Sequence, residues 1–196
     1  MAHDSINVRE DGRVQRAVVD REQLAREMVE AAYLEGDFVL ASGRRSRYYF
    51  DKYRFETRPE LLAPVASLIA DLIPAGTARI AGPELGAVAL AAAASLASGL
   101  PCLFVRGEAK AYGTANRIEG PFEPGDTVAV IEDVMTSGAS AIKAAQALAE
   151  AGCRIARIIG VIDREEGAAE AVADAGYELV AVFTRSELER YLVSIR

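Results

Sequence analysis

Histidine, cysteine and tryptophan are scarce in this 196-residue chain, which has one histidine, two cysteines and no tryptophan. His3 lies near the N-terminus in a polar stretch, so we expect neither a Ser-His or Cys-His catalytic pair nor a histidine-based zinc site. Cys102 and Cys153 lie in apolar stretches without the spacing of a metal or redox motif. We expect both to be buried free thiols, so the chemistry of the protein must use other residue types.

The chain also lacks a long apolar segment and an excess of positive charge. Its longest apolar stretch, residues 87–97, is mostly alanine and far shorter than the roughly 20 residues of a membrane helix. The first ten residues are polar and give no secretory signal. The net charge of −7 argues against nucleic acid or an anionic membrane as the main partner. We therefore predict a cytoplasmic protein that binds neither.

Hydrophobic periodicity distinguishes two regions of the chain. Residues 21–35 repeat apolar side chains at helical spacing, residues 38–41 and 47–51 have the pattern of short strands, and a second helix is predicted over 59–73. Further along, apolar strands alternate with helices. The predicted strands are 79–81, 102–105, 127–131, 155–162 and 179–183, and the predicted helices are 85–98, 139–151, 165–175 and 186–190.

Continuous apolar strands that alternate with helices are typical of a parallel sheet covered by helices on both faces. We therefore predict an α/β fold in one compact domain, with residues 76–196 as its core and residues 1–75 as an N-terminal helix and hood region. Residues 106–126 interrupt the alternation with four glycines and two prolines. A loop of this length in a compact domain is usually functional or disordered.

One segment carries the pattern of a sugar-phosphate site. The predicted strand 127–131 is followed by Glu132 and Asp133, and then by small residues, Thr136–Ser140, at the start of a helix. Ligands of open α/β sheets bind beyond the carboxyl ends of the strands, and the free N–H groups of a helix start favour an anion. Gly138 allows a phosphate to approach the backbone closely.

The two carboxylates would repel a phosphate on their own. They suit the site if they accept hydrogen bonds from sugar hydroxyls or approach a metal ion carried by the phosphates. The alternative is that the Ser and Thr residues only cap a helix beside two surface acids. Neither a Gly-Lys-Ser/Thr loop nor a Gly-x-Gly-x-x-Gly fingerprint occurs, which argues against a kinase, an ATPase or a dehydrogenase.

Three segments resemble those of a known family. Residues 130–140, Val-Ile-Glu-Asp-Val-Met-Thr-Ser-Gly-Ala-Ser, resemble the motif that binds phosphoribosyl pyrophosphate (PRPP) in type I phosphoribosyltransferases. Residues 104–120 resemble the mobile catalytic loop of orotate phosphoribosyltransferases, and residues 38–51 are similar to their N-terminal Ser-Gly-Arg/Lys-x-Ser-x-Tyr segment. The resemblance spans roughly residues 20–190. It implies the type I fold and an enzyme of pyrimidine biosynthesis that converts PRPP and orotate into orotidine monophosphate and pyrophosphate.

The resemblance also implies a role for each motif residue. The implied catalytic residues are Lys110, Arg106 and Asp133, and the implied orotate-binding residues are Thr136, Arg164, Tyr49 and Phe50. The implied PRPP-binding residues are Arg106, Lys110, Tyr112, Glu132, Asp133, Val134, Met135, Thr136, Ser137, Gly138, Ala139 and Ser140. The family uses Mg²⁺ that is held mainly by PRPP and water, with no direct protein ligand. It works as a homodimer in which loop 106–120 reaches the neighbouring active site.

The chain departs from the better-known family pattern at several cationic positions. Ala41, Leu85 and Gly107 stand where members carry basic residues, and Tyr112 replaces a frequent loop histidine. Possible substitutes for the missing charge are Lys52, Arg44, Arg45 and Arg117. Two alternative functions remain open at this point: a phosphoribosyltransferase for another base, such as a purine, and a non-catalytic PRPP-sensing regulator.

Overall fold

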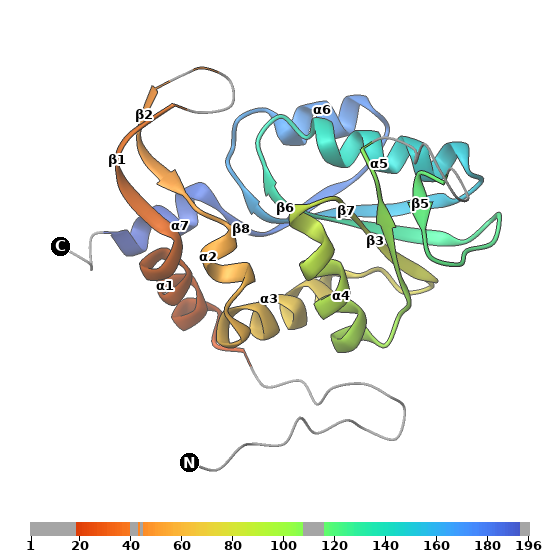
Figure 1. Cartoon of the computed structure of the whole chain (residues 1–196), viewed down its shortest axis with the longest axis horizontal. Coiled ribbons are helices and arrows are strands. Elements are labelled where there is room, and N and C mark those ends of the chain that lie inside the picture. Colours follow the sequence, from red (N-terminus) through yellow and green to blue (C-terminus); the bar gives the residue numbers. More distant parts are fainter. Residues whose placement is uncertain (1–18, 40–42, 44, 108–115, 193–196) are drawn as a thin grey trace, which may run out of the picture.

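The structure is a computed structural model that describes residues 19–39, 43, 45–107 and 116–192. Helices and strands alternate along most of this range (Figure 1). In chain order the elements are α1 (Arg21–Ala32), β1 (Tyr33–Val39), β2 (Arg45–Phe50), α2 (Tyr53–Glu56), α3 (Pro59–Leu72), β3 (Arg79–Pro83), α4 (Gly86–Ser98), β4 (Cys102–Val105), β5 (Ile118–Glu119), β6 (Thr127–Met135), α5 (Ala139–Glu150), β7 (Arg154–Asp163), α6 (Ala168–Asp174), β8 (Leu179–Thr184) and α7 (Arg185–Leu192).

The central sheet has six strands in the order β5-β4-β3-β6-β7-β8. Neighbouring strands are parallel, except that β5 is antiparallel to β4. The chain leaves β3 toward β4 on one side and leaves β6 toward β7 on the other, so the strand order reverses between β3 and β6 (Figure 1). Ligands of open α/β sheets bind at such a switch point, beyond the carboxyl ends of the strands.

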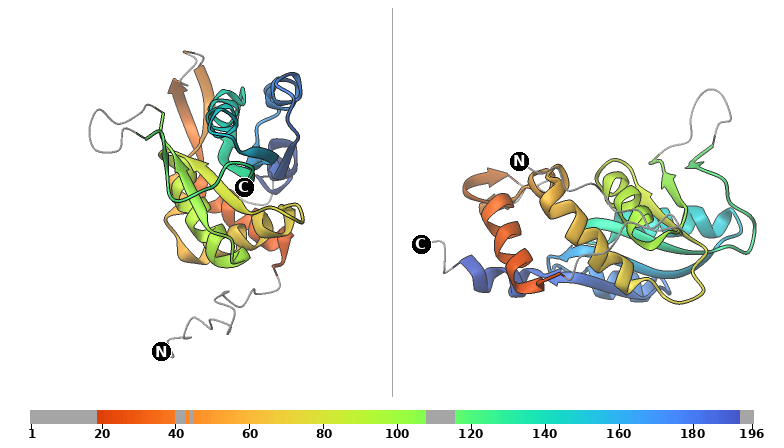
Figure 2. Two further views of the ribbon diagram at one scale, coloured as in Figure 1. Left: turned by 90° about the vertical axis from the view of Figure 1, so that its right-hand side faces the viewer. Right: turned by 90° about the horizontal axis from the view of Figure 1, so that it is seen from below.

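Helices cover both faces of this sheet (Figure 2). Side chains of α3 and α4 pack with Ala129 and Ile131 in one hydrophobic cluster, whereas side chains of α5 and α6 pack with Val128 and Val130 in another. Successive residues of β6 therefore alternate between two apolar layers, as in a strand buried on both faces. The predicted α/β fold, with a mainly parallel sheet and helices on both faces, is confirmed.

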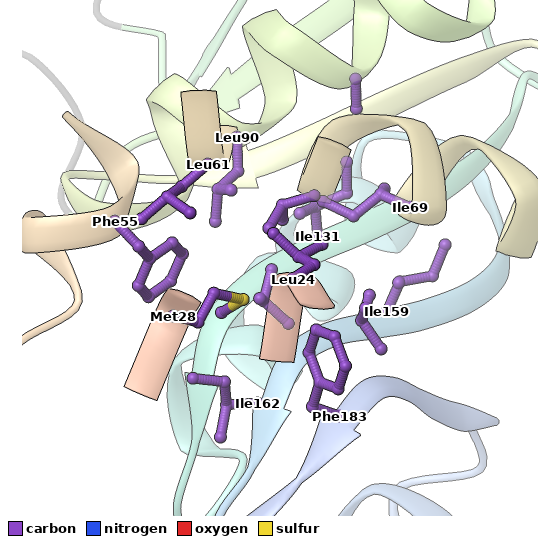
Figure 3. Close-up of a cluster of buried hydrophobic side chains, with 14 of the residues drawn as sticks. Leu24, Met28, Phe55, Leu61, Ile69, Leu90, Ile131, Ile159, Ile162 and Phe183 are labelled. Atoms are coloured by element: carbon purple, nitrogen blue, oxygen red, sulfur yellow. The ribbon is translucent and has the colours of Figure 1, made fainter. Parts of the chain in front are cut away.

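The larger cluster joins the N-terminal helices to the sheet. Met28 of α1, Phe55 of α2 and Leu61 of α3 share it with Ile131 of β6 and Phe183 of β8 (Figure 3), and each is at most 2% exposed. Burial of one such side chain stabilises the fold by about 1.5–3 kcal/mol. The cluster crosses residue 75, so the predicted hood and core share apolar packing; a division of the chain at that residue stays a prediction.

An antiparallel hairpin of β1 and β2 stands beside the sheet (Figure 1). The predicted helix over 21–35 is too long, because α1 ends at Ala32 and Tyr33 begins β1 opposite Phe50. The Asp51 N–H donates to the carbonyl of Ala32 at 2.8 Å, which fixes this exchange of helix for strand. Tyr33 fits the apolar spacing of the helix, but its ring stacks on Tyr48 of β2, with 5.6 Å between centroids.

Two further differences from the predicted pattern affect the site. β6 continues to Met135 rather than ending at residue 131, because Glu132 and Met135 remain paired with Gly160 and Asp163 of β7. The short strand β5 lies inside the predicted loop 106–126 and pairs with β4, which brings the two ends of that loop together. Within the described ranges, every helix is too short or too polar to cross a bilayer.

Candidate active site

The carboxyl ends of β3 and β6 meet at the switch point of the sheet. β3 ends at Pro83, and the chain turns through Glu84 and Leu85 into α4. β6 ends at Met135, and the chain passes through residues 136–138 into α5. The segment that the sequence predicts to hold a sugar phosphate therefore lies where ligand sites of this fold class occur.

The start of α5 forms a hollow, which we call the phosphate hollow. Its N-cap residue, Gly138, has a φ of 75°, a conformation that favours glycine. No side chain of the described chain caps this helix, so the N–H groups of its first turn remain available to a ligand. The hollow is lined by Glu132, Val134, Met135, Thr136, Ser137, Gly138, Ala139, Ser140 and Ala141. Eight of the twelve residues implied to bind PRPP thus gather around it.

Glu132 and Asp133 lie within β6 and point to opposite faces, because successive side chains of a strand alternate. Glu132 accepts a hydrogen bond from Ser140 at the start of α5. Asp133 forms an ion pair with Lys52 and lies against Gly86 at the start of α4. A Cβ atom on Gly86 would lie 1.6 Å from Asp133 Oδ2, so this close approach requires glycine. The two acids therefore flank the end of β6, one beside each helix.

Two buried carboxyl groups near the end of β6 have raised pKa values. Burial, and then repulsion from Asp133, raises the pKa of Glu132 to about 7. Burial and the charge of Asp133 likewise raise the pKa of Glu56, a residue of α2, to about 8. Burial lowers the pKa of Lys52, but its hydrogen bond to Asp133 and the charge of that residue outweigh burial, so the net shift is upward.

Two of these carboxylate oxygens are buried and have no hydrogen-bond partner among the described residues. They are Oε2 of Glu132 and Oε1 of Glu56. Buried polar atoms are normally hydrogen-bonded, so an unpartnered oxygen beside a ligand hollow is a place where a donor of the ligand can bind. Glu132 lines the phosphate hollow, and a sugar hydroxyl is a donor of the required kind.

The base of the predicted catalytic loop is joined to the turn after β3. Arg106 follows β4, its N–H donates to the carbonyl of Arg117 at 2.8 Å, and its guanidinium lies 3.8 Å from Glu119. The N–H of Gly107 donates to Glu84 Oε1 at 3.0 Å. The loop therefore starts and ends beside the switch point. Lys110 and Tyr112, the other residues implied in this loop, lie outside the described residues.

A second hollow, which we call the aromatic pocket, lies between the hairpin, α7 and the end of the sheet. It is lined by Val29, Tyr33, Tyr48, Phe50, Val134, Ile162, Arg164, Arg185, Leu188, Glu189 and Leu192. The Arg164 guanidinium pairs with Glu166 at 2.9 Å and lies 6.0 Å from the centroid of Tyr48. The backbone N–H of Arg164 donates to the carbonyl of Met135 at 2.9 Å, which holds the residue beside the end of β6.

The hairpin separates two residues that the resemblance placed together. Phe50 lines the aromatic pocket, but Tyr49 does not. Tyr49 is 40% exposed and packs on Phe38, with 5.5 Å between ring centroids. Alternation along β2 puts Tyr48 and Phe50 on one face and Tyr49 on the other. The structure therefore brings Phe50 and Arg164 together and leaves Tyr49 outside the pocket.

Several residues near the end of β6 and in the pocket were not among the predicted site residues. Tyr48 was identifiable from the strand pattern alone, because it shares a face with Phe50. Arg185, whose pKa is raised by a hydrogen bond to Tyr48, reaches the pocket from α7, and no motif marked it. Lys52 was only a possible substitute cation, and Glu56 lies in a helix that the sequence pattern did not predict.

Val134 lines both the phosphate hollow and the aromatic pocket. The two hollows therefore adjoin at the end of β6, on either side of one residue. One contains the free N–H groups of a helix start, which suit a phosphate. The other combines apolar walls with two guanidinium groups, which suit a flat ring that carries a carboxylate.

Curated relatives with high similarity share one name, although no protein-family model matches the chain. The chain is 47% identical over 156 residues to the orotate phosphoribosyltransferase of Methanocella arvoryzae, which covers 80% of this chain and 89% of the relative. It is 44% identical over 172 residues to the orotate phosphoribosyltransferase of Thermococcus gammatolerans, and this match covers 86% of this chain and 91% of the relative. The similarity therefore spans nearly the whole length of these relatives.

Solved structures agree with the relatives. The Mycobacterium tuberculosis orotate phosphoribosyltransferase in complex with Fe(III) dicitrate superposes with a TM-score of 0.78 at 33% identity, covering 87% of this chain and 99% of that one. The same enzyme in complex with PRPP gives 0.75 at 30% identity, with 87% and 99% covered. Fold, motif order and relatives lead to the same assignment, and the chain belongs to the orotate phosphoribosyltransferase family.

Proposed function

We propose that this enzyme transfers the phosphoribosyl group of PRPP to orotate and releases orotidine monophosphate and pyrophosphate, a step of pyrimidine biosynthesis. The observation that carries this proposal is the pair of hollows that adjoin at Val134. The phosphate hollow suits the 5′-phosphate, and the aromatic pocket suits a flat ring with a carboxylate. A ribose that links the two reacts at its C1′ atom near the end of β6.

In this proposal the phosphate hollow binds PRPP through backbone and hydroxyl donors. The N–H groups of residues 137–140 and the hydroxyls of Thr136 and Ser137 hold the 5′-phosphate. Glu132 and Asp133 accept hydrogen bonds from the ribose hydroxyls. The unpartnered Oε2 atom of Glu132 supports this role, because a ribose hydroxyl would satisfy it.

Orotate binds in the aromatic pocket in this proposal. Its carboxylate pairs with Arg164, whose planar fork matches both oxygens, and its ring packs against Phe50. Thr136 follows Met135, whose carbonyl accepts from the Arg164 N–H, so it also lies near the base. A test of the hairpin compares two variants: Phe50→Ala raises KM for orotate, whereas Tyr49→Ala leaves it unchanged if the pocket is lined as described.

The reaction breaks the bond between C1′ and the pyrophosphate oxygen and forms a bond between C1′ and the base nitrogen, with release of the nitrogen's proton. Positive charge grows on the ribose ring and negative charge on the leaving pyrophosphate. Asp133, beside the ribose, stabilises the first, and Arg106 and Lys110 on the loop neutralise the second. Closure of the loop over the site excludes water and so prevents hydrolysis of PRPP.

Magnesium enters this site with PRPP in our proposal. We place magnesium on phosphate oxygens and water, as the resemblance to the family implies. The carboxylates of Glu132 and Asp133 fit a role in hydrogen bonding to that water shell. Bound magnesium would neutralise the charge of the diphosphate.

A homodimer is the proposed assembly, with loop 106–120 reaching the neighbouring active site. Leu96, near the C-terminal end of α4, is 60% exposed, and an apolar side chain of this size on a surface supports an interface. The cytoplasmic location stays a prediction from the sequence.

One assay separates the proposed function from its alternatives. The protein is incubated with PRPP, magnesium and orotate, and the loss of orotate absorbance is followed. Turnover of a purine but not of orotate would show a phosphoribosyltransferase for another base. Binding of PRPP without turnover of any base would show a non-catalytic regulator.

A further inference from the structure

Lys52 brings an ammonium group to the turn between β3 and α4. The residue follows β2 and stands at the N-cap of α2, yet its Nζ atom reaches Asp133 in β6, which is 81 positions further along the chain. A Cβ atom on Gly86 would lie 2.5 Å from that Nζ atom, so the ammonium touches the first residue of α4. The N-terminal segment thus supplies a cation to the switch point of the sheet.

The turn itself contains an acid and an apolar residue but no cation. Leu85, which directly precedes Gly86, is apolar and 73% exposed. The same turn binds the base of the catalytic loop through Glu84 and Gly107. The ammonium of Lys52 therefore lies one residue along the turn from the exposed, apolar Leu85.

The charges around Lys52 show why this position needs a cation. Glu56, Glu132 and Asp133 act electrostatically on the same ammonium, and all three are buried. An incoming diphosphate would meet repulsion from Asp133, the carboxylate that pairs with Lys52. Lys52 offsets that repulsion, and its side chain is 28% exposed whereas that of Asp133 is 4% exposed. An ammonium has three donors, so Lys52 can bind Asp133 and a ligand at once.

We propose that Lys52 binds the diphosphate of PRPP and supplies the positive charge that Leu85 does not. This inference rests on the proposed function, because the ribose hydroxyls must lie on Glu132 and Asp133 for the diphosphate at C1′ to reach the turn. In the absence of substrate the ammonium neutralises Asp133. In the complex it bridges Asp133 and an oxygen of the diphosphate.

The test compares three ligands by isothermal titration calorimetry: pyrophosphate with magnesium, PRPP with magnesium, and ribose 5-phosphate. Lys52→Met is expected to weaken pyrophosphate and PRPP by roughly 10- to 100-fold, the worth of a charged hydrogen bond. Ribose 5-phosphate, which lacks the diphosphate, is expected to stay within about twofold. Equal weakening of all three ligands would mean that Lys52 only positions Asp133, and unchanged pyrophosphate binding would also overturn the proposal.

Two further variants keep the test independent of folding. Leu85→Lys alone leaves the ion pair of Lys52 intact, and it is expected to tighten pyrophosphate but not ribose 5-phosphate. Combined with Lys52→Met, it is expected to restore pyrophosphate binding. A double variant as weak as Lys52→Met would refute the exchange of one cation for the other. Arg154→Met, which removes an exposed charge at the opposite end of the sheet, is the matched control.

Failure of the proposed function would give a different result. If wild-type protein binds pyrophosphate and PRPP but does not consume orotate, the assignment of the base fails while the comparison of Lys52 variants stands. If orotate is consumed at the wild-type rate and pyrophosphate affinity is unchanged in Lys52→Met, the inference about Lys52 fails alone.

Discussion

Gly86→Ala is expected to damage both the fold and the PRPP site. In an ordinary helix position, replacing glycine by alanine stabilises a protein by roughly 0.5–1 kcal/mol. At position 86 the added Cβ would lie 1.6 Å from Asp133 Oδ2 and 2.5 Å from Lys52 Nζ. No real contact is that short, so either α4 must shift or the ion pair must open. The sign of the stability change should therefore be reversed.

The structure sets the size of this effect. Forcing an extra carbon into a packed site costs about 1–3 kcal/mol, and Asp133 is only 4% exposed, so it has little room to move. In a chain of this length such a loss lowers Tm by roughly 3–10 °C. Displacement of Asp133 should also weaken PRPP by about tenfold or more, because a hydrogen bond to a charged group is lost.

Thermal unfolding and a PRPP titration measure the two effects. Gly107→Ala is the control for stability, since a Cβ there would lie at an ordinary 3.7 Å from Glu84 Oε1. A Gly86→Ala protein with an unchanged or higher Tm and wild-type PRPP affinity would refute the contact between α4 and Asp133. It would also remove the geometric basis for placing Lys52 in the site.

Four further changes test other parts of the site. Lys110→Ala is expected to cut turnover by orders of magnitude without lowering Tm, and wild-type turnover would refute the role of the loop. Arg164→Met should raise KM for orotate by roughly 10- to 100-fold with little change for PRPP, whereas equal changes would argue against a carboxylate contact. Folding raises the pKa of Glu56 from 4.5 to about 8, so the folded state holds this proton more tightly and the free energy of unfolding falls as pH rises between those values. Glu56→Gln should remove up to about 5 kcal/mol of that fall, as measured by urea unfolding. The control Glu60→Gln should leave the pH dependence unchanged. Leu96→Glu should convert a dimer into monomers in sedimentation, and an unchanged mass would exclude α4 from the interface.

The sheet and its covering helices were predictable from the sequence because their patterns are local. Apolar runs such as 155–162 mark strands buried on both faces, and the structure extends this one only to Arg154–Asp163. The predicted ends of helices and strands were wrong where residues contact partners that are distant in sequence. Tyr33 fits the helical pattern, but its contact with Tyr48 belongs to a strand. β6 extends beyond its apolar run because pairing with β7 continues through Glu132, Val134 and Met135.

The candidate site was predictable where one segment contains it and not where several elements meet. The phosphate hollow comes from consecutive residues and was found as a motif. The contact of Lys52 with Asp133, and the approach of Arg185 to Tyr48, depend on how α2 and α7 pack on the sheet. Phe50 was identified by resemblance, but only the pairing of the hairpin shows that Tyr49 faces away.

In the proposed complex, Val134 is a fixed spacer between the two substrates. It belongs to a strand paired with β7, so its backbone has little freedom to move, and it lines both the phosphate hollow and the aromatic pocket. The distance from phosphate to base is thereby set by a stiff part of the sheet and not by the loops. Under the proposed function, selection among bases would depend on length as well as charge, since a ring would have to reach C1′ and also keep its carboxylate on Arg164.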